Sequence, residues 1–195
     1  MEFLSFALQE VEMFQTANNG KTPLLVTFET HRQRLFGSPF QTREILKMVQ
    51  EQTESYFSLL KLNADLSHWY CACERVFDPK QTRDETWWPA LLEKVAERCY
   101  YIHARLGWSQ GPQMADPSAP ECEPERTLQV ETCKVLVKEI MGRNDDHDDD
   151  SCFMSPEFGP PPYLPVMPHS QKPVASLPAA VAYTKTLLDD LVGQL

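Results

Sequence analysis

The stretch PFQTREILKMVQEQTESYFSLLKLNADLSHWYCACERVF, residues 39–77, contains the most regular pattern in the chain and decides the expected fold. Its apolar side chains recur in steps of four and three, which is the spacing of one face of an α-helix. The ten positions of this series are Ile45, Val49, Gln52, Tyr56, Leu59, Asn63, Leu66, Tyr70, Cys73 and Phe77. All except Gln52 and Asn63 are apolar or aromatic. The pattern predicts a helix over 39–77, either unbroken or bent near Asn63.

Both ends of this stretch carry helix boundary signals. Ser38 can cap a helix, Pro39 suits the first helical position, and Gln41 completes a capping box. At the other end, Asp78-Pro79 stops the pattern. Further apolar residues widen the stripe beyond a two-helix seam, so we expect this helix to pack against several neighbours.

The rest of the chain predicts more helices. Residues 24–28 have the composition of a strand, but no partner strand is evident, and a short helix over 24–36 is therefore favoured. Together these segments predict an all-α fold, a bundle of four to five helices. The other expected helices cover residues 2–17, 88–107, 123–142 and 179–195.

Charge and proline divide the chain in two. Residues 1–110 hold 12 basic and 14 acidic side chains, whereas residues 111–195 hold 6 and 14 and most of the prolines. Such an acidic, proline-rich composition is typical of tails and linkers. We therefore expect a helical bundle over 1–107, a linker over 108–122, an additional bundle helix over 123–142, an acidic and Pro-rich disordered segment over 143–178, and an amphipathic C-terminal helix over 179–195.

Composition also excludes some classes of protein. A formal net charge of −10 argues against direct, non-specific binding of nucleic acid, which requires clustered Lys and Arg. No apolar run is long enough to cross a bilayer. The N-terminus lacks the basic region of a signal peptide, and the six cysteines are therefore expected to be reduced thiols in the cytoplasm or nucleus.

Histidine and cysteine residues form one candidate metal site. His68, Cys71 and Cys73 lie close together in the sequence, as do Cys99 and His103. On two antiparallel helices these side chains could present soft ligands to zinc. The alternative is ordinary burial of cysteine in the core, because the spacing matches no standard zinc finger.

The acidic run offers a weaker resemblance to a calcium loop. Asp146, Asp148 and Asp150 alternate, and Glu157 stands at the twelfth position. The glycine required at the sixth position is replaced by Ser151. These residues are better interpreted as a solvated acidic spacer.

The tail contains two candidate partner-binding segments. Pro160, Pro161 and Tyr163 fit the Pro-Pro-x-Tyr motif that WW domains bind as a polyproline II segment. The alternative is a stiff linker that contains the motif by chance. The final helix carries Leu187, Leu188 and Leu191 on one face, which either folds back onto the bundle or binds a groove on a partner.

The sequence thus favours a non-enzymatic intracellular protein-protein interaction module, such as a regulatory subunit or transcriptional co-regulator. Common catalytic signatures are absent, and only 7 glycines are available for phosphate-binding turns. No cofactor is expected unless the His/Cys cluster holds zinc. The alternatives are a zinc-stabilised helical protein and a small cysteine-dependent enzyme, and the broad 39–77 stripe also makes a homodimer plausible.

Overall fold

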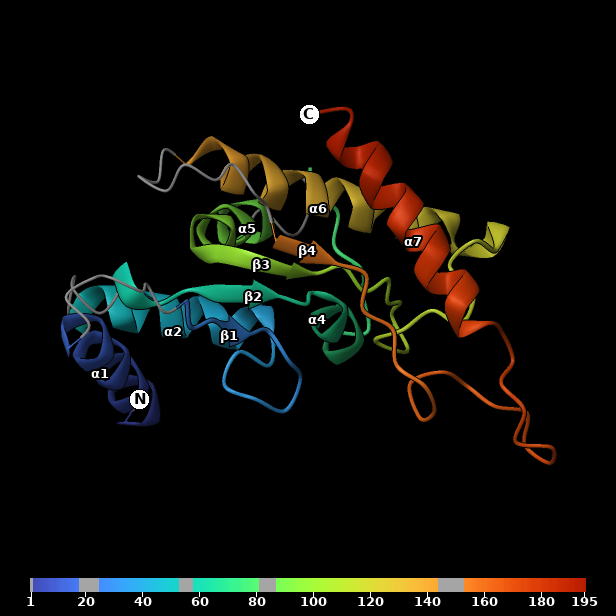
Figure 1. Ribbon diagram of the computed structural model, residues 1–195, viewed down its shortest axis with the longest axis horizontal. Coiled ribbons are helices and arrows are strands. Elements are labelled where there is room, and N and C mark those ends of the chain that lie inside the picture. The colour runs from blue at the N-terminus through green and yellow to red at the C-terminus, as the bar shows by residue number, and fades with distance from the viewer. Residues whose placement is uncertain (1, 18–24, 53–57, 81–86, 144–152) are drawn as a thin grey trace.

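The structure is a computed structural model, and it describes residues 2–17, 25–52, 58–80, 87–143 and 153–195. It is a mixed α/β fold built on a parallel four-stranded sheet, so the prediction of an all-α bundle was wrong. In Figure 1 the strands follow one another from bottom to top, with α1 and α2 below them and α5 and α6 above. The helices are α1 (Glu2–Ala17), α2 (Pro39–Gln52), α4 (Ser67–Ala72), α5 (Trp87–Arg98), α6 (Glu123–Gly142) and α7 (Leu177–Val192), with a 3-10 turn, η1, at Pro120–Cys122.

The four strands pair in the order in which they occur in the chain. They are β1 (Phe28–Glu29), β2 (Leu62–Ala64), β3 (Cys99–His103) and β4 (Phe153–Ser155), all parallel. Parallel strands need long crossover connections, and here the crossovers contain the helices. In other folds built from parallel strands and helices, such as βα barrels, ligand-binding residues follow the carboxyl ends of the strands.

The stretch that predicted one long helix divides into three elements. The helix α2 ends at Gln52, the strand β2 covers Leu62–Ala64, and α4 covers Ser67–Ala72. The strand lies between β1 and β3, and all three of its residues are buried. A short buried strand reads as a continuous apolar run, which periodicity alone cannot distinguish from a buried helix.

Two other expected helices also contain strands. The segment predicted as a short helix over 24–36 holds β1, and the helix expected over 88–107 ends at Arg98, where β3 begins. The β3 sequence CYYIH is rich in aromatic and β-branched residues, which favour a strand. The missing partner of residues 24–28 is therefore β2, which had been assigned to the long helix.

The two faces of the sheet differ in character. One face carries Ala64 and Ile102, which meet Leu136 of α6 and Leu188 of α7 around a small apolar cavity. The register places Glu29, Asn63, Tyr101 and Phe153 in one row on the opposite face. On that face Phe153 is 52% exposed and stacks on Tyr101. The row that contains Glu29 and Asn63 thus lies on the more open face of the sheet.

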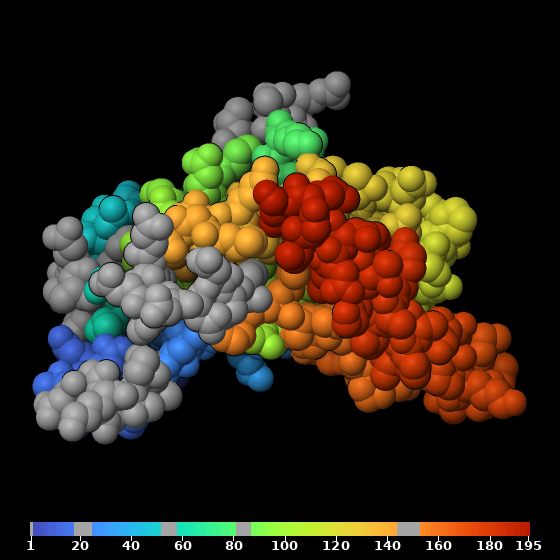
Figure 2. Space-filling view, turned by 45° about the horizontal axis from the view of Figure 1, so that its top comes forward, coloured from blue at the N-terminus to red at the C-terminus, as the bar shows by residue number. Residues whose placement is uncertain are grey.

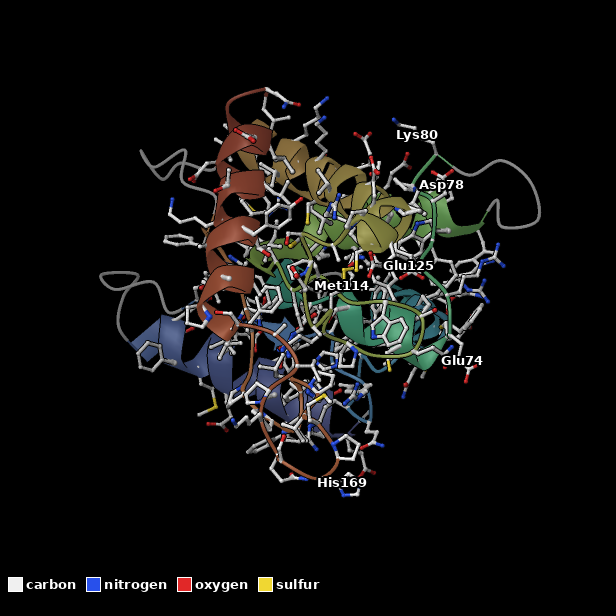
Figure 3. The ribbon with its side chains drawn as sticks, turned by 90° about the vertical axis from the view of Figure 1, so that its right-hand side faces the viewer. Glu74, Asp78, Lys80, Met114, Glu125 and His169 are labelled. Atoms are coloured by element: carbon white, nitrogen blue, oxygen red, sulfur yellow. The ribbon has the colours of Figure 1, made fainter. Side chains whose placement is uncertain are left out.

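The region expected to be disordered over 143–178 contains defined structure from residue 153 onwards. The strand β4 completes the sheet, and the chain beyond it turns back on itself through backbone hydrogen bonds from Val174 to Pro165 and from Met167 to Lys172. In Figure 3 this arm carries His169 at one extremity of the molecule, while Asp78 and Lys80 lie at the other. A role for β4 in the sheet explains why this segment is ordered despite its prolines.

The C-terminal helix folds back onto the protein. Figure 2 shows α7, coloured red, lying against α6. Leu188 and Leu191 are buried in the main apolar core, and Leu187 lines the cavity between the sheet and α6. None of the helices in the described ranges is long and apolar enough to cross a membrane.

Replacing Leu191 by aspartate should destabilise the protein by about 3 kcal/mol or more, because the change removes a buried side chain and buries a charge. Leu191 is 1% exposed, whereas Leu195 in the same terminal segment is 42% exposed and provides the matched control. Urea unfolding followed by circular dichroism measures the difference. Equal unfolding midpoints for Leu191→Asp and Leu195→Asp would show that α7 is not docked in solution.

Candidate metal centre

Four ionisable side chains meet at the carboxyl edge of the sheet. Glu29 ends β1, Asp65 follows β2, His103 ends β3, and Glu157 comes two residues after β4. One ligand atom from each of these four residues lies within 4.8 Å of the others. Because parallel strands place their carboxyl ends at one edge, residues far apart in the sequence converge there. We call these four residues the carboxylate–histidine cluster.

His103 stands between two of the carboxylates. Its Nδ1 lies 3.0 Å from Glu29 Oε1 and 2.5 Å from Glu157 Oε2. The side-chain amide of Asn63 lies 3.1 Å from Nε2. Burial opposes the charged ring, but the two glutamates outweigh it and raise the pKa of His103 to about 10. In the absence of a metal ion, a proton on His103 therefore neutralises part of the negative charge.

Asp65 is fully buried and held on every side. Its Oδ2 accepts a hydrogen bond from Arg105 Nε at 3.1 Å, and its Oδ1 accepts bonds from the hydroxyl and backbone N–H of Ser67. Its own N–H donates to Thr30 Oγ1 at 2.8 Å. Burial raises the pKa of Asp65 to about 7, although the nearby Arg105 partly opposes the shift. The fold thus positions a carboxylate where its negative charge is poorly solvated.

Arg105 joins two members of the cluster. Besides Asp65, it contacts Glu157, with Nη2 2.5 Å from Oε1. Burial favours the neutral form of Glu157, but His103 and Arg105 outweigh burial and lower its pKa to about 2. Arg105 therefore fixes the orientation of both carboxylates and favours their charged forms, while leaving other oxygen lone pairs available to a cation.

His68 borders the cluster as a buried, neutral side chain. Its Nε2 lies 3.5 Å from Asp65 Oδ2, and neither ring nitrogen has a hydrogen-bond partner among the described residues. Burial, together with nearby His31, Arg105 and Arg32, lowers the pKa of His68 to about 3. Buried polar groups are normally hydrogen-bonded. In the described part of the chain, His68 is thus a buried imidazole without a hydrogen-bond partner beside the carboxylate–histidine cluster.

The donor set suits a divalent cation that accepts both oxygen and nitrogen ligands. Carboxylates favour Mg²⁺ and Mn²⁺, whereas imidazole favours the transition metals, so three carboxylates and one imidazole fit Mn²⁺ well. An octahedral ion with ligands at about 2.1 Å places its ligand atoms roughly 3–4 Å apart. The observed separations of up to 4.8 Å require only a small contraction around the ion.

The structure separates most of the His/Cys set considered as a zinc site. His103 belongs to the cluster and His68 borders it, but Cys71 contacts Arg32, and Cys99 is buried with its thiol directed to the carbonyl of Tyr101. Cys73 is half-buried just after α4. The predicted arrangement needed two facing helices, and residues 99–103 form a strand instead.

Sequence reasoning missed Glu29 and Asp65 and considered Glu157 only as part of a calcium loop. Asp146, Asp148 and Asp150 lie outside the described residues. The available signal was an acid or histidine directly after each of several short apolar runs, in Glu29-Thr30-His31, Asp65-Leu66-Ser67-His68 and His103-Ala104-Arg105. That signal has meaning only once the runs are recognised as parallel strands.

The Pro-Pro-x-Tyr motif lies beside the same site. The N–H of Tyr163 donates to the carbonyl of Pro160 at 3.0 Å, so the segment forms a turn in which Pro161 is exposed. The ring of Tyr163 lies 4.7 Å from the guanidinium of Arg105. Binding to a WW domain stays a prediction, and it would require this ring to leave Arg105.

Comparisons with known proteins give no information on this site, so its interpretation rests on the geometry. No family model, no curated protein and no solved structure matches this chain.

Proposed function

We propose that the carboxylate–histidine cluster binds one divalent metal ion, best fitted by Mn²⁺, and that the protein is a metal-dependent enzyme acting on a small, oxygen-rich substrate. The observation that carries this proposal is the convergence of Glu29, Asp65, His103 and Glu157 within 4.8 Å at the carboxyl edge of a parallel sheet. Binding sites of parallel α/β proteins characteristically lie at this edge.

Electrostatics supports a cation as the occupant. Three carboxylates share a small, partly buried volume, and Arg105 supplies one fixed positive charge against them. The second positive charge is the proton on His103, which a metal ion can displace because the neutral imidazole is the ligand form. A divalent cation would therefore replace the single, exchangeable positive charge of the His103 proton with a double charge held by the cluster.

The surroundings fit catalysis better than a purely structural metal. Structural zinc sites are closed by four protein ligands, typically with thiolates, whereas this set contains no cysteine and lies on the half-open face of the sheet. A bound divalent ion polarises a carbonyl or hydroxyl oxygen of a substrate that reaches it. His68, neutral and unpaired, is placed to exchange a hydrogen bond or a proton with such a substrate.

A non-enzymatic interaction module, the function favoured by the sequence, stays a prediction. Its two supporting features were the helical bundle and the tail motif. The bundle is replaced by an α/β fold, and Tyr163 of the motif packs beside the candidate metal centre. The metal-dependent enzyme is therefore the function that the geometry supports best.

Protein purified without a histidine tag, stripped of metal and titrated with Mn²⁺, should bind close to one equivalent in isothermal titration calorimetry. Glu157→Gln should weaken this binding by about 100-fold, because it removes a charged ligand and a partner of Arg105. The matched control is Glu131→Gln, which breaks only the ion pairs with Lys80 and Lys134 on the surface of α6. Absence of saturable binding to the wild-type protein would reject the proposal.

A further inference from the structure

The loop after β1 places two basic residues beside the candidate metal centre. The N–H of Arg34 donates to the carbonyl of His31 at 3.1 Å, and Gln33 adopts a left-handed backbone with φ of 61°. The chain therefore turns at once after the strand, which keeps His31 and Arg32 near the end of β1. The ring of His31 lies 3.8 Å from the ring of His68, measured between centroids.

The guanidinium groups of Arg32 and Arg105 both lie near the aromatic ring of Tyr163. The Arg32 guanidinium lies 5.8 Å from the centre of that ring, and the Arg105 guanidinium lies 4.7 Å from it. His68 approaches the same ring edge-on at 6.5 Å. Tyr163 is thus contacted by Arg105 and His68 at the metal centre and by Arg32 of the β1 loop.

The two arginines differ in how their charges are balanced. Arg105 contacts two carboxylates, whereas no acidic group of the described ranges lies within 4 Å of Arg32. Its hydrogen bond is to the thiol of Cys71, with Nη1 3.5 Å from Sγ, and sulfur is a weak acceptor. Among the described residues the guanidinium has no other hydrogen bond, and its planar fork matches carboxylate and phosphate oxygens, so it is suited to an anion.

We propose that Arg32, assisted by His31, binds the anionic group of the substrate, a carboxylate or phosphate, while an adjacent hydroxyl or carbonyl oxygen of the same molecule ligates the metal. This inference deepens the proposed function and rests on it. It assigns the substrate class as a small 2-hydroxy or 2-oxo acid, or a phosphate ester of similar size. In this proposal the substrate reaches from Arg32 past His68 to the cluster.

Charge favours this orientation over the reverse. The cluster contains three carboxylates, so it repels an anionic group unless the metal ion is bound, whereas the β1 loop presents an arginine that has no acidic partner in the described part of the chain. Tyr163 covers part of the guanidinium and reduces its contact with water, which strengthens its attraction to an anion. One end of the site therefore selects the charge of the substrate and the other activates its oxygen.

Calorimetric titration of the Mn²⁺-loaded protein tests the assignment with three probes: glycolate, inorganic phosphate and the uncharged ethylene glycol. Glycolate or phosphate should bind and ethylene glycol should not, and the tighter anion identifies the group. Arg32→Gln should weaken anion binding by about tenfold or more, the loss expected for a charge-assisted hydrogen bond. Arg34→Gln, which alters an exposed arginine two residues away, should bind as the wild type does.

Mn²⁺ affinity is measured first for each variant, and Arg32→Gln should retain it. Equal anion affinity for Arg32→Gln and wild type, or equal binding of glycolate and ethylene glycol, would overturn the inference while leaving the metal site intact. If the wild-type protein binds no Mn²⁺, the proposed function fails. Arg32-dependent binding of phosphate to the metal-free protein would then still support the anion site, and its absence would reject it. Should Arg32→Gln not fold, Arg32→Lys takes its place and is expected to show a smaller but clear weakening.

Discussion

Asp65→Asn should abolish the stabilisation that Mn²⁺ gives to this protein. A metal ion present at about 100 times its dissociation constant raises the free energy of unfolding by about 2.7 kcal/mol, because it binds the folded state alone. Asparagine keeps the size of the side chain but removes the negative charge that the ion requires. The expected result is a large rise in melting temperature on adding Mn²⁺ to the wild type and little or none in the variant.

The metal-free variant, in contrast, should keep its fold and lose only about 1–3 kcal/mol at neutral pH, the cost of one unmade hydrogen bond to a buried charged group. Burial raises the pKa of Asp65 to about 7, so the fold holds its charged form at a cost that asparagine does not incur. The amide oxygen can still accept the two hydrogen bonds from Ser67, but the amide NH2 then takes the place of the oxygen that accepts from Arg105. Arg105 also keeps its contact with Glu157, which limits the penalty of losing the charge on Asp65.

Differential scanning fluorimetry with and without Mn²⁺ provides both readings in one experiment. The control is Asp189→Asn, which removes an exposed carboxylate paired with Lys185 on α7 and should leave the metal response unchanged. A Mn²⁺ response of wild-type size in Asp65→Asn would show that the ion binds elsewhere. A collapse of the metal-free protein would instead show that Asp65 serves mainly as the partner of Arg105.

The parts of the fold that the sequence predicted well are the exposed, amphipathic helices. The expected helices over 2–17, 123–142 and 179–195 agree closely with α1, α6 and α7, since each packs an apolar stripe of helical spacing against the protein. The strands were missed because each is only two to five residues long and is buried or partly buried. Such runs lack alternation, and their identity depends on neighbours that are distant in the sequence.

The site was missed for the same reason. Asn63 and Leu66 fitted the helical series of 39–77, and Asp65 between them was not considered as a site residue. In the structure Asp65 lies at the end of a strand and contacts Arg105, which is 40 residues away. Among the four residues of the cluster, His103 was the one considered as a zinc ligand, because histidine is a common metal ligand in any fold. A carboxylate is recognised as a candidate metal ligand only from its position in the fold.

Trp69→Ala should cause the largest loss of stability among single substitutions near the site, about 3–5 kcal/mol. Trp69 is fully buried, its indole N–H donates to the carbonyl of Phe36 at 2.8 Å, and its ring meets Trp88 edge-on. The substitution removes a large apolar volume and leaves the Phe36 carbonyl without this donor. Urea unfolding should show a much lower midpoint for this variant.

The same substitution should also weaken Mn²⁺ binding, although Trp69 is not a ligand. The helix α4 has only six residues and cannot form without tertiary contacts, and Trp69 is one of its main anchors in the core. Its first turn supplies the Ser67 hydrogen bonds to Asp65 and places His68 against the cluster. Trp108→Ala, at a tryptophan that is 44% exposed, should change neither property by more than a small amount. If Trp69→Ala lowered stability but bound Mn²⁺ at full affinity while folded, α4 would not be needed to position the ligands, and the geometry of Asp65 would have to come from β2 and Thr30 alone.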